Sequence, residues 1–184
     1  MVSDSDAEIA FYTFAGGTAS LLQPAYHLSR ISSMSMGPAS VHTLLLGELA
    51  TGAGVVVYFG HGSVAQWSSQ HILDNADVES MRNGAKLPFV MAMTCLDAFF
   101  QDVTMTSLAE ALVNAPNGGA IAVWTSSGLT APEHQTALAE AMTRLLVAGN
   151  LTIGEAAAAA KKSAPDADVR STWILLGDPS LHLR

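Results

Sequence analysis

The chain of 184 residues is poor in cysteine, in charge and in long apolar runs. Its single cysteine, Cys95, excludes an intrachain disulfide. Basic residues number 8 against 16 acidic ones, and the net charge of −8 leaves no basic patch for nucleic acid. No apolar run approaches the roughly 18 residues that a membrane-spanning helix needs. We therefore expect no nucleic-acid partner and no insertion into a membrane.

Short apolar runs carry the high hydrophobic content of 49%, which is too high for a disordered chain. Residues 55–59 (VVVYF) and 120–125 (AIAVWT) are short and rich in β-branched residues, as buried strands are. Residues 87–94 have the same character, with Pro88 near the start. Helical patterns lie between these strands. The alternation predicts a single α/β domain over residues 1–184, with a mostly parallel sheet covered by helices on both faces (three layers, α/β/α).

The expected helices are marked by apolar spacing and by capping boxes that start at Ser107, Thr130 and Thr152. They span residues 7–22, 39–50, 75–82, 107–114, 130–149 and 152–162. Three segments are less regular. Residues 26–31 are expected to form a short strand, residues 169–176 to be helical although a strand is the alternative, and residues 180–183 to form a final edge strand.

Two reactive residues follow predicted strands directly. His61 lies within Gly-His-Gly-Ser after residues 55–59, and Cys95 follows residues 87–94. If these strands are parallel neighbours, both side chains reach the same edge of the sheet, where open α/β sheets bind ligands. A thiolate and an imidazole at one edge favour nucleophilic attack on a carbonyl carbon. The alternatives without a catalytic role are a buried thiol for Cys95 and an ordinary His-Gly turn for His61.

The surroundings of this pair give further expectations. The Gly62 and Cys95 N–H groups are candidates for an oxyanion hole, and the glycines beside His61 are expected to let a peptide approach closely. Other polar or aromatic residues near the two strand ends are candidates to line a substrate cleft, although Trp67 could equally be buried against the sheet. These cleft candidates are Ser63, Trp67, Thr94, Thr125 and Ser126.

Metal binding is the weaker alternative. A zinc site would have to use His61, His71 and Cys95, which lack the tight paired spacing of structural zinc ligands. Asp97 and Asp102 could tune the thiol or bind a cation, but a solvated loop is the expected setting for both. No metal and no cofactor are expected.

Several segments together resemble the gingipain-type cysteine peptidases of the caspase-like clan. The likeness covers residues 40–184 and rests on residues 56–63 with Trp67, residues 88–95, residues 107–112 leading into 118–123, and residues 173–181. It implies a caspase-like fold and an endopeptidase in which Cys95 and His61 hydrolyse peptide bonds in a protein or peptide substrate. It also implies secretion or cell-surface location within a larger precursor, although residues 1–6 carry no signal pattern.

The chain departs from the family pattern near its start. The family's earlier strands are not recognisable, so we expect the domain to be incomplete at its N-terminus. The acidic residues ahead of His61, which are Asp4, Asp6, Glu8 and Glu48, match no acidic site residue of the family. Residues 126–130 lack the family's tryptophan over the specificity pocket, so no preference for Arg or Lys is transferred. The alternative function is a non-catalytic module whose apolar sheet edge recruits a second copy or further domains.

Overall fold

The computed structural model describes residues 1–22 and 26–183. Its strands are β1 (Val2–Ser3), β2 (Ile31–Ser32), β3 (Val55–Phe59), β4 (Gln66–Trp67), β5 (Leu73–Asp74), β6 (Phe89–Met93), β7 (Ala122–Ser126) and β8 (Trp173–Gly177). Its helices are α1 (Phe11–Leu22), α2 (Ser33–Met36), α3 (Pro38–Thr51), α4 (Asn75–Ser80), α5 (Leu108–Asn114), α6 (Pro132–Ala148), α7 (Ile153–Ser163) and α8 (Ala167–Thr172).

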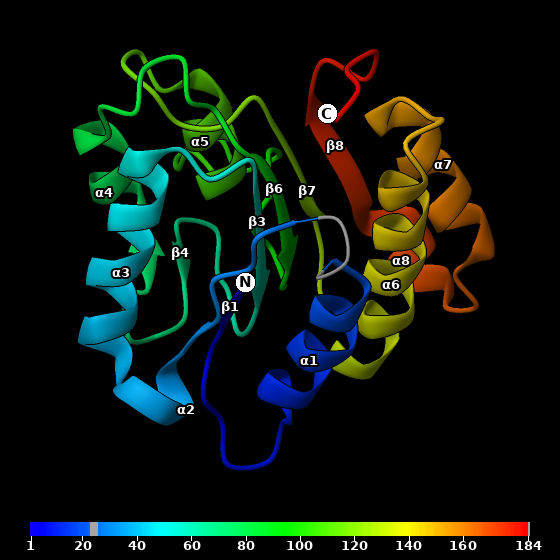
Figure 1. The fold of residues 1–184 in the computed structure, drawn as a ribbon, viewed down its shortest axis with the longest axis horizontal. Coiled ribbons are helices and arrows are strands. Elements are labelled where there is room, and N and C mark those ends of the chain that lie inside the picture. The colour runs from blue at the N-terminus through cyan, green and yellow to red at the C-terminus, as the bar shows by residue number, and fades with distance from the viewer. Residues whose placement is uncertain (23–25, 184) are drawn as a thin grey trace.

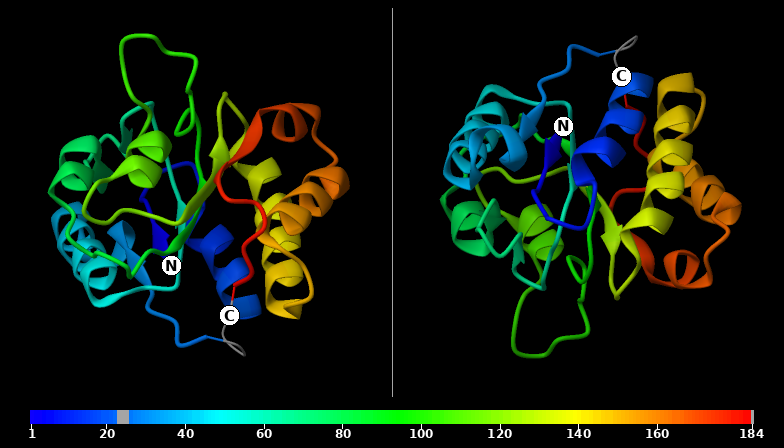
Figure 2. Two further views of the ribbon diagram at one scale, coloured as in Figure 1. Left: turned by 90° about the horizontal axis from the view of Figure 1, so that it is seen from above. Right: turned by 90° about the horizontal axis from the view of Figure 1, so that it is seen from below.

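Six of these strands form one sheet in the order β2-β1-β3-β6-β7-β8. All neighbours are parallel except β7 and β8, which are antiparallel. Helices α1, α6, α7 and α8 lie on one side of this sheet, and α3, α4 and α5 lie on the other (Figure 1 and Figure 2). The predicted three-layer α/β/α architecture is confirmed.

Each face of the sheet has its own hydrophobic core because side chains alternate along every strand. In β3, Val57 and Phe59 face the α1 and α6 side, whereas Val56 and Tyr58 face the α3 side. Every residue of β6 is buried, as expected for a central parallel strand. None of the helices in the described part of the chain is long and apolar enough to cross a membrane.

The capping boxes at Ser107 and Thr152 are confirmed, since in each case the side-chain oxygen accepts the N–H three residues on and the glutamate there accepts the N–H of the cap. The prediction of a capping box at Thr130 is wrong. Helix α6 begins after Ala131 with no side-chain cap, because the Thr130 hydroxyl instead accepts a hydrogen bond from Gln135 at 2.9 Å.

The remaining corrections fall at the sheet edges. Residues 169–176 are helical only to Thr172, because Trp173–Gly177 pairs with β7 along its whole length as strand β8. Residues 180–183 form no strand. The strand expected over residues 26–31 starts only at Ile31, and residue 25 lies outside the described residues. Strand β1 was not predicted, since two residues are too short to give a periodic pattern.

Candidate active site

His61 and Cys95 leave adjacent strands at the same edge of the sheet. Strands β3 and β6 are parallel, and the last residues of the two strands, Phe59 and Met93, lie opposite each other. His61 and Cys95 each follow two residues beyond that pair. The N–H of Gly60 donates to the carbonyl of Met93 at 3.3 Å, so the pairing continues past the strand ends.

The two glycines beside His61 are required by contacts with the protein itself. A Cβ atom on Gly60 would lie 2.1 Å from the Tyr58 hydroxyl oxygen, and one on Gly62 would lie 2.3 Å from Oγ1 of Thr94. At both positions, the direction that a side chain would take therefore points into the protein interior. The expectation that they are bare so that a peptide can approach is wrong, and close packing of the His61 loop on Thr94 and Cys95 takes its place.

Asp6 orients the ring of His61. Its Oδ2 lies 3.0 Å from Nε2 of His61, and its Oδ1 accepts the N–H groups of Glu8 and Ile9. These hydrogen bonds, first that of Glu8 and then that of His61, lower the pKa of Asp6, which is therefore ionised at neutral pH. The imidazole ring also meets the ring of Phe11 edge-on, with centroids 5.1 Å apart.

The position of Asp6 corrects the expectation that no acidic residue ahead of His61 belongs to the site. With Nε2 directed at a carboxylate, Nδ1 is the ring nitrogen that remains to exchange a proton. The His61 side chain is 51% exposed. A signal for Asp6 does exist in the sequence, because it follows a parallel strand as His61 and Cys95 do. That strand, β1, has only two residues and escapes detection.

The thiol of Cys95 is half-buried and faces the loop between β7 and α6. Sγ donates weakly to the carbonyl of Thr130 at 3.3 Å, and it accepts from Thr130 N at 3.5 Å and from Nε2 of Gln135 at 3.9 Å. Within residues 1–22 and 26–183, Sγ has no hydrogen bond to His61. Gln135 was not predicted. It is 2% exposed although polar, and its amide ties the thiol to Thr130.

Two backbone N–H groups at this edge are unpaired. Neither the Gly62 N–H nor the Cys95 N–H has an acceptor among the described residues. For Gly62 the direction is fixed, because the carbonyl of His61 accepts both the Tyr58 hydroxyl and the Ser68 N–H at 2.7 Å. In a trans peptide the carbonyl and the following N–H point in opposite directions. The Gly62 N–H therefore points away from Tyr58 and Ser68.

Trp67 lies beneath the His61 loop and does not line a cleft. It is 1% exposed, its ring stacks on Tyr58 with centroids 4.4 Å apart, and its Nε1 donates to Oδ1 of Asp97 at 3.0 Å. Of the two expectations for Trp67, burial is the one observed. Asp97 itself is completely buried, so its expected place in a solvated loop is also wrong. Asp102 is partly exposed, and its carboxylate accepts the N–H of Thr104 at 2.8 Å.

Three further cleft candidates are buried at 0% exposure, which is not compatible with lining an open cleft. Thr94 packs under Gly62, Thr125 donates to the Ala92 carbonyl at 2.8 Å, and Ser126 donates to the Gly128 carbonyl at 3.0 Å. These three residues pack inside the protein at this edge of the sheet. Ser63 alone among the cleft candidates is exposed, and its role stays a prediction.

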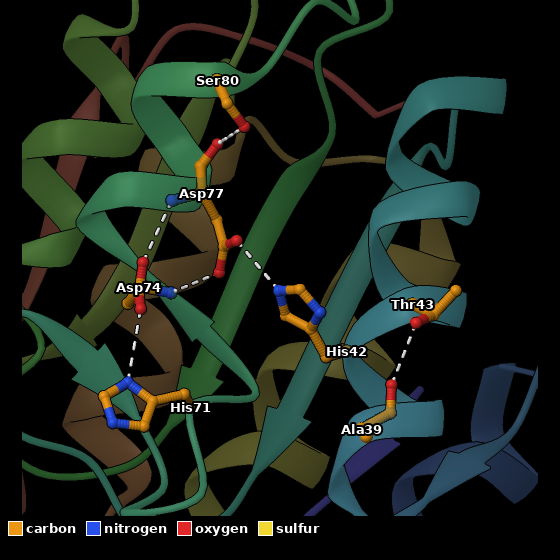
Figure 3. A network of polar contacts seen from close by, with 7 residues as sticks. All are labelled: Ala39, His42, Thr43, His71, Asp74, Asp77 and Ser80. Atoms are coloured by element: carbon orange, nitrogen blue, oxygen red, sulfur yellow. Dashed lines mark hydrogen bonds and ion pairs between the residues drawn. The ribbon is translucent and has the colours of Figure 1, made fainter.

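The zinc alternative has no cluster of ligands behind it. No group of three or more His, Cys, Asp or Glu side chains suited to a metal ion occurs in the part of the chain that the structure describes. His71 pairs instead with Asp74, at 3.3 Å from Nδ1 to Oδ2 (Figure 3). Asp74 caps helix α4 together with Asp77, whose carboxylate also binds His42 at 2.9 Å.

The fold and this edge define a class. A six-stranded three-layer α/β/α domain with a histidine and a cysteine after neighbouring parallel strands is the arrangement of caspase-like cysteine peptidases. The chain belongs to peptidase family C25, whose family model matches residues 4–184. No curated protein sequence matches the chain significantly.

Solved structures share the fold. The Arg-specific cysteine proteinase gingipain R superposes with a TM-score of 0.81 at 21% identity, over 100% of this chain and 47% of that one. The complex of Porphyromonas gingivalis RgpB pro- and mature domains gives a TM-score of 0.82 at 20% identity, over 100% and 48%. A structure described as a protease gives 0.79 at 15% identity, over 100% and 47%. The chain thus spans about half the length of these structures.

Proposed function

We propose that this chain is a cysteine endopeptidase in which Cys95 is the nucleophile and His61 its proton partner. The observation that carries the proposal is the register of β3 and β6, which delivers both residues two positions beyond a matched pair. Membership of peptidase family C25 supports the same chemistry. Asp6 completes the set by holding Nε2 of His61 and so leaving Nδ1 for the thiol proton.

The reaction follows from these parts. His61 takes the proton of Cys95, and the thiolate forms a bond to the carbonyl carbon while the carbonyl π electrons move to oxygen. The Gly62 and Cys95 N–H groups, both unpaired among the described residues, stabilise that oxyanion. When the tetrahedral intermediate collapses, the C–N bond breaks and His61 returns the proton to the departing amine. Water then hydrolyses the thioester and regenerates the thiol.

The thiol must turn before it can react. In the structure Sγ points to the Thr130 carbonyl, and catalytic hydrogen bonds are often longer or misaligned in the free enzyme. Rotation about the Cα–Cβ bond of Cys95 exchanges the contact with Thr130 for one with His61. Substrate binding beside residues 126–130 would drive this rotation if it displaces the Thr130 carbonyl.

The relatives support a proposal about location and partners. We propose that the protein is secreted or displayed at the cell surface within a larger precursor, as its family suggests. One solved relative is a complex of pro- and mature domains. The partners proposed here are a peptide or protein substrate together with further domains or a second copy of the chain.

The test is peptide hydrolysis and thiol labelling with the purified chain. We expect cleavage of a peptide library, and loss of cleavage by at least a thousandfold in Cys95→Ala and His61→Ala. His71→Ala is the matched control, because His71, like His61, is an exposed histidine paired with an aspartate. Normal labelling of Cys95 without any hydrolysis would instead support the non-catalytic module.

A further inference from the structure

A chain of buried side chains joins the segment after Cys95 to the backbone after His61. Asp97 lies two residues beyond Cys95 and accepts from Nε1 of Trp67 at 3.0 Å. Trp67 stacks flat on Tyr58, with an angle of 4° between the ring planes. The Tyr58 hydroxyl donates to the His61 carbonyl at 2.7 Å. The three side chains have exposures of 0 or 1%.

Trp67 influences the His61 carbonyl by two routes. One is the ring of Tyr58 stacked against it, and the other is Ser68, the next residue, whose N–H donates to the same carbonyl at 2.7 Å. Both donors at this carbonyl therefore depend on where the indole lies. The indole in turn is anchored at its one polar atom by Asp97.

The carboxyl group of Asp97 depends on Trp67 in the same way. Thr125 gives its hydroxyl proton to the Ala92 carbonyl, and Oδ2 of Asp97 has no hydrogen-bond partner among the described residues. Trp67 is thus the donor to Oδ1, the oxygen of this buried carboxyl group that has a partner. A buried carboxyl group with one unpaired oxygen is costly for stability, which is typical of a residue kept for function.

We propose that Asp97, Trp67 and Tyr58 are positioning residues that hold the peptide between His61 and Gly62, so that the Gly62 N–H is aimed at the oxyanion. The inference rests on the proposed function. The physical reason is the trans peptide: fixing the His61 carbonyl from the inside fixes the Gly62 N–H on the outside. A donor that is already oriented needs no reorganisation when charge develops on the substrate oxygen.

Two reactions of Cys95 separate this role from a general effect on the site. Hydrolysis of a peptide passes through an oxyanion, whereas alkylation by iodoacetamide displaces iodide from a CH₂ carbon and forms none. Tyr58→Phe removes the hydroxyl and keeps the stacked ring. We expect kcat for peptide hydrolysis to fall about tenfold to a hundredfold, somewhat less than the loss of a whole oxyanion-hole donor. KM and the alkylation rate of Cys95 should stay within about twofold of the wild type.

The roles of Trp67 and Asp97 are tested by the variants Trp67→Phe and Asp97→Ala. Each should lower kcat about tenfold, and the double variant should lower it no further, because both changes remove the same contact. Asp97→Asn should recover kcat to within about threefold of the wild type, since its side-chain oxygen still accepts from the indole. Trp124→Phe is the matched control, because Trp124 is buried on the opposite face and its Nε1 has no partner among the described residues.

The outcomes distinguish failure of the positioning role from failure of the proposed peptidase function. If the wild-type chain hydrolyses peptides and Tyr58→Phe keeps its kcat, the positioning role is overturned and the proposed function stands. If kcat and the alkylation rate fall together in Tyr58→Phe, the role is also overturned, because the damage then reaches the thiol. If the wild type hydrolyses no peptide and His61→Ala alkylates as fast as the wild type, both proposals fail. Should Trp67→Phe fail to fold, Tyr58→Phe decides.

Discussion

Oδ2 of Asp6 lies 3.0 Å from Nε2 of His61, although 55 residues separate them in the sequence. Asp6 follows β1, and His61 follows β3, which pairs with β1 directly. Three successive strands of the sheet, β1, β3 and β6, thus each contribute one residue to the same edge. Carboxylate, imidazole and thiol are presented in that order across the sheet.

Substitution of Asp6 should impair catalysis more than stability. Asp6→Ala removes the hydrogen bond that orients the imidazole of His61. We expect kcat/KM to fall roughly tenfold to a hundredfold. Steady-state hydrolysis of one peptide, with Glu8→Gln as an exposed acidic control next to Asp6, measures this. Equal activity of Asp6→Ala and the wild type would remove Asp6 from the site.

The pKa of Asp6 gives this contact a pH limit. Because the folded pKa lies below the ordinary value of 3.8, the contact contributes stability above that value and loses it as the pH falls through the folded pKa. We therefore expect wild type and Asp6→Ala to differ in activity at pH 6–8. The small difference in their unfolding free energies should disappear once the pH falls below the folded pKa of Asp6.

Gly62→Ala should damage both fold and site. Its Cβ would lie 2.3 Å from Oγ1 of Thr94 and 3.0 Å from the Cys95 carbonyl oxygen, and the backbone there has little room to yield. Overpacking of this kind costs about 1–3 kcal/mol, which a urea titration measures. Gly47→Ala in α3 is the control, because nothing lies within 4 Å of its added Cβ and alanine favours a helix. Similar midpoints for the two variants would contradict the packing argument.

Asp97 should make the stability of the protein depend on pH between about 4 and 7. Burial raises the pKa of Asp97 to about 7. In this range the folded state holds a proton that the unfolded state has released, so unfolding free energy falls as the pH rises and levels off above about 7. The total effect is at most about 4 kcal/mol, from 1.36 kcal/mol for each pKa unit.

The comparison is urea unfolding of wild type and Asp97→Asn from pH 5 to 8. Asp97→Asn should lose most of the pH dependence and gain stability relative to the wild type at pH 8. Asp102→Asn should keep the wild-type slope between pH 5 and 8, because hydrogen bonds from Thr104 lower the pKa of Asp102 and it is ionised throughout this range. An unchanged slope in Asp97→Asn would show that Asp97 is ionised throughout.

Ser107→Ala should destabilise helix α5 without changing the chemistry. The Ser107 hydroxyl accepts the N–H of Glu110 at 3.3 Å, and the Glu110 carboxylate accepts the N–H of Ser107 at 3.1 Å. Removing such a cap costs about 1 kcal/mol. Thermal unfolding should show a lower Tm of a few degrees, whereas kcat at 25 °C should be unchanged. Ser163→Ala is the comparison, because Ser163 is the last residue of α7 and takes no part in the capping box at the start of that helix.

Much of the architecture could be predicted because it depends on local patterns. The apolar runs of β3, β6 and β7 and the capping boxes at Ser107 and Thr152 specify their elements within a few residues. The errors occurred where the local pattern is weak. Strand β8 was expected to be helical, because its edge pairing with β7 depends on a strand some 50 residues earlier in the chain.

The sequence by itself determined the strands and helices of the α/β/α architecture and the place of His61 and Cys95 directly after strands, since apolar periodicity and the order of elements along the chain need no distant contact. The structure then made β3 and β6 parallel neighbours. Only the tertiary structure decided which residues surround that pair. It brought Asp6 to His61 from a strand of two residues, turned Trp67 and Asp97 inward beneath the His61 loop, and directed the Gly62 N–H outward. The physical reason is that these contacts join residues about 30 to 55 positions apart, or depend on the direction of one peptide plane, and neither leaves a periodic trace in the sequence.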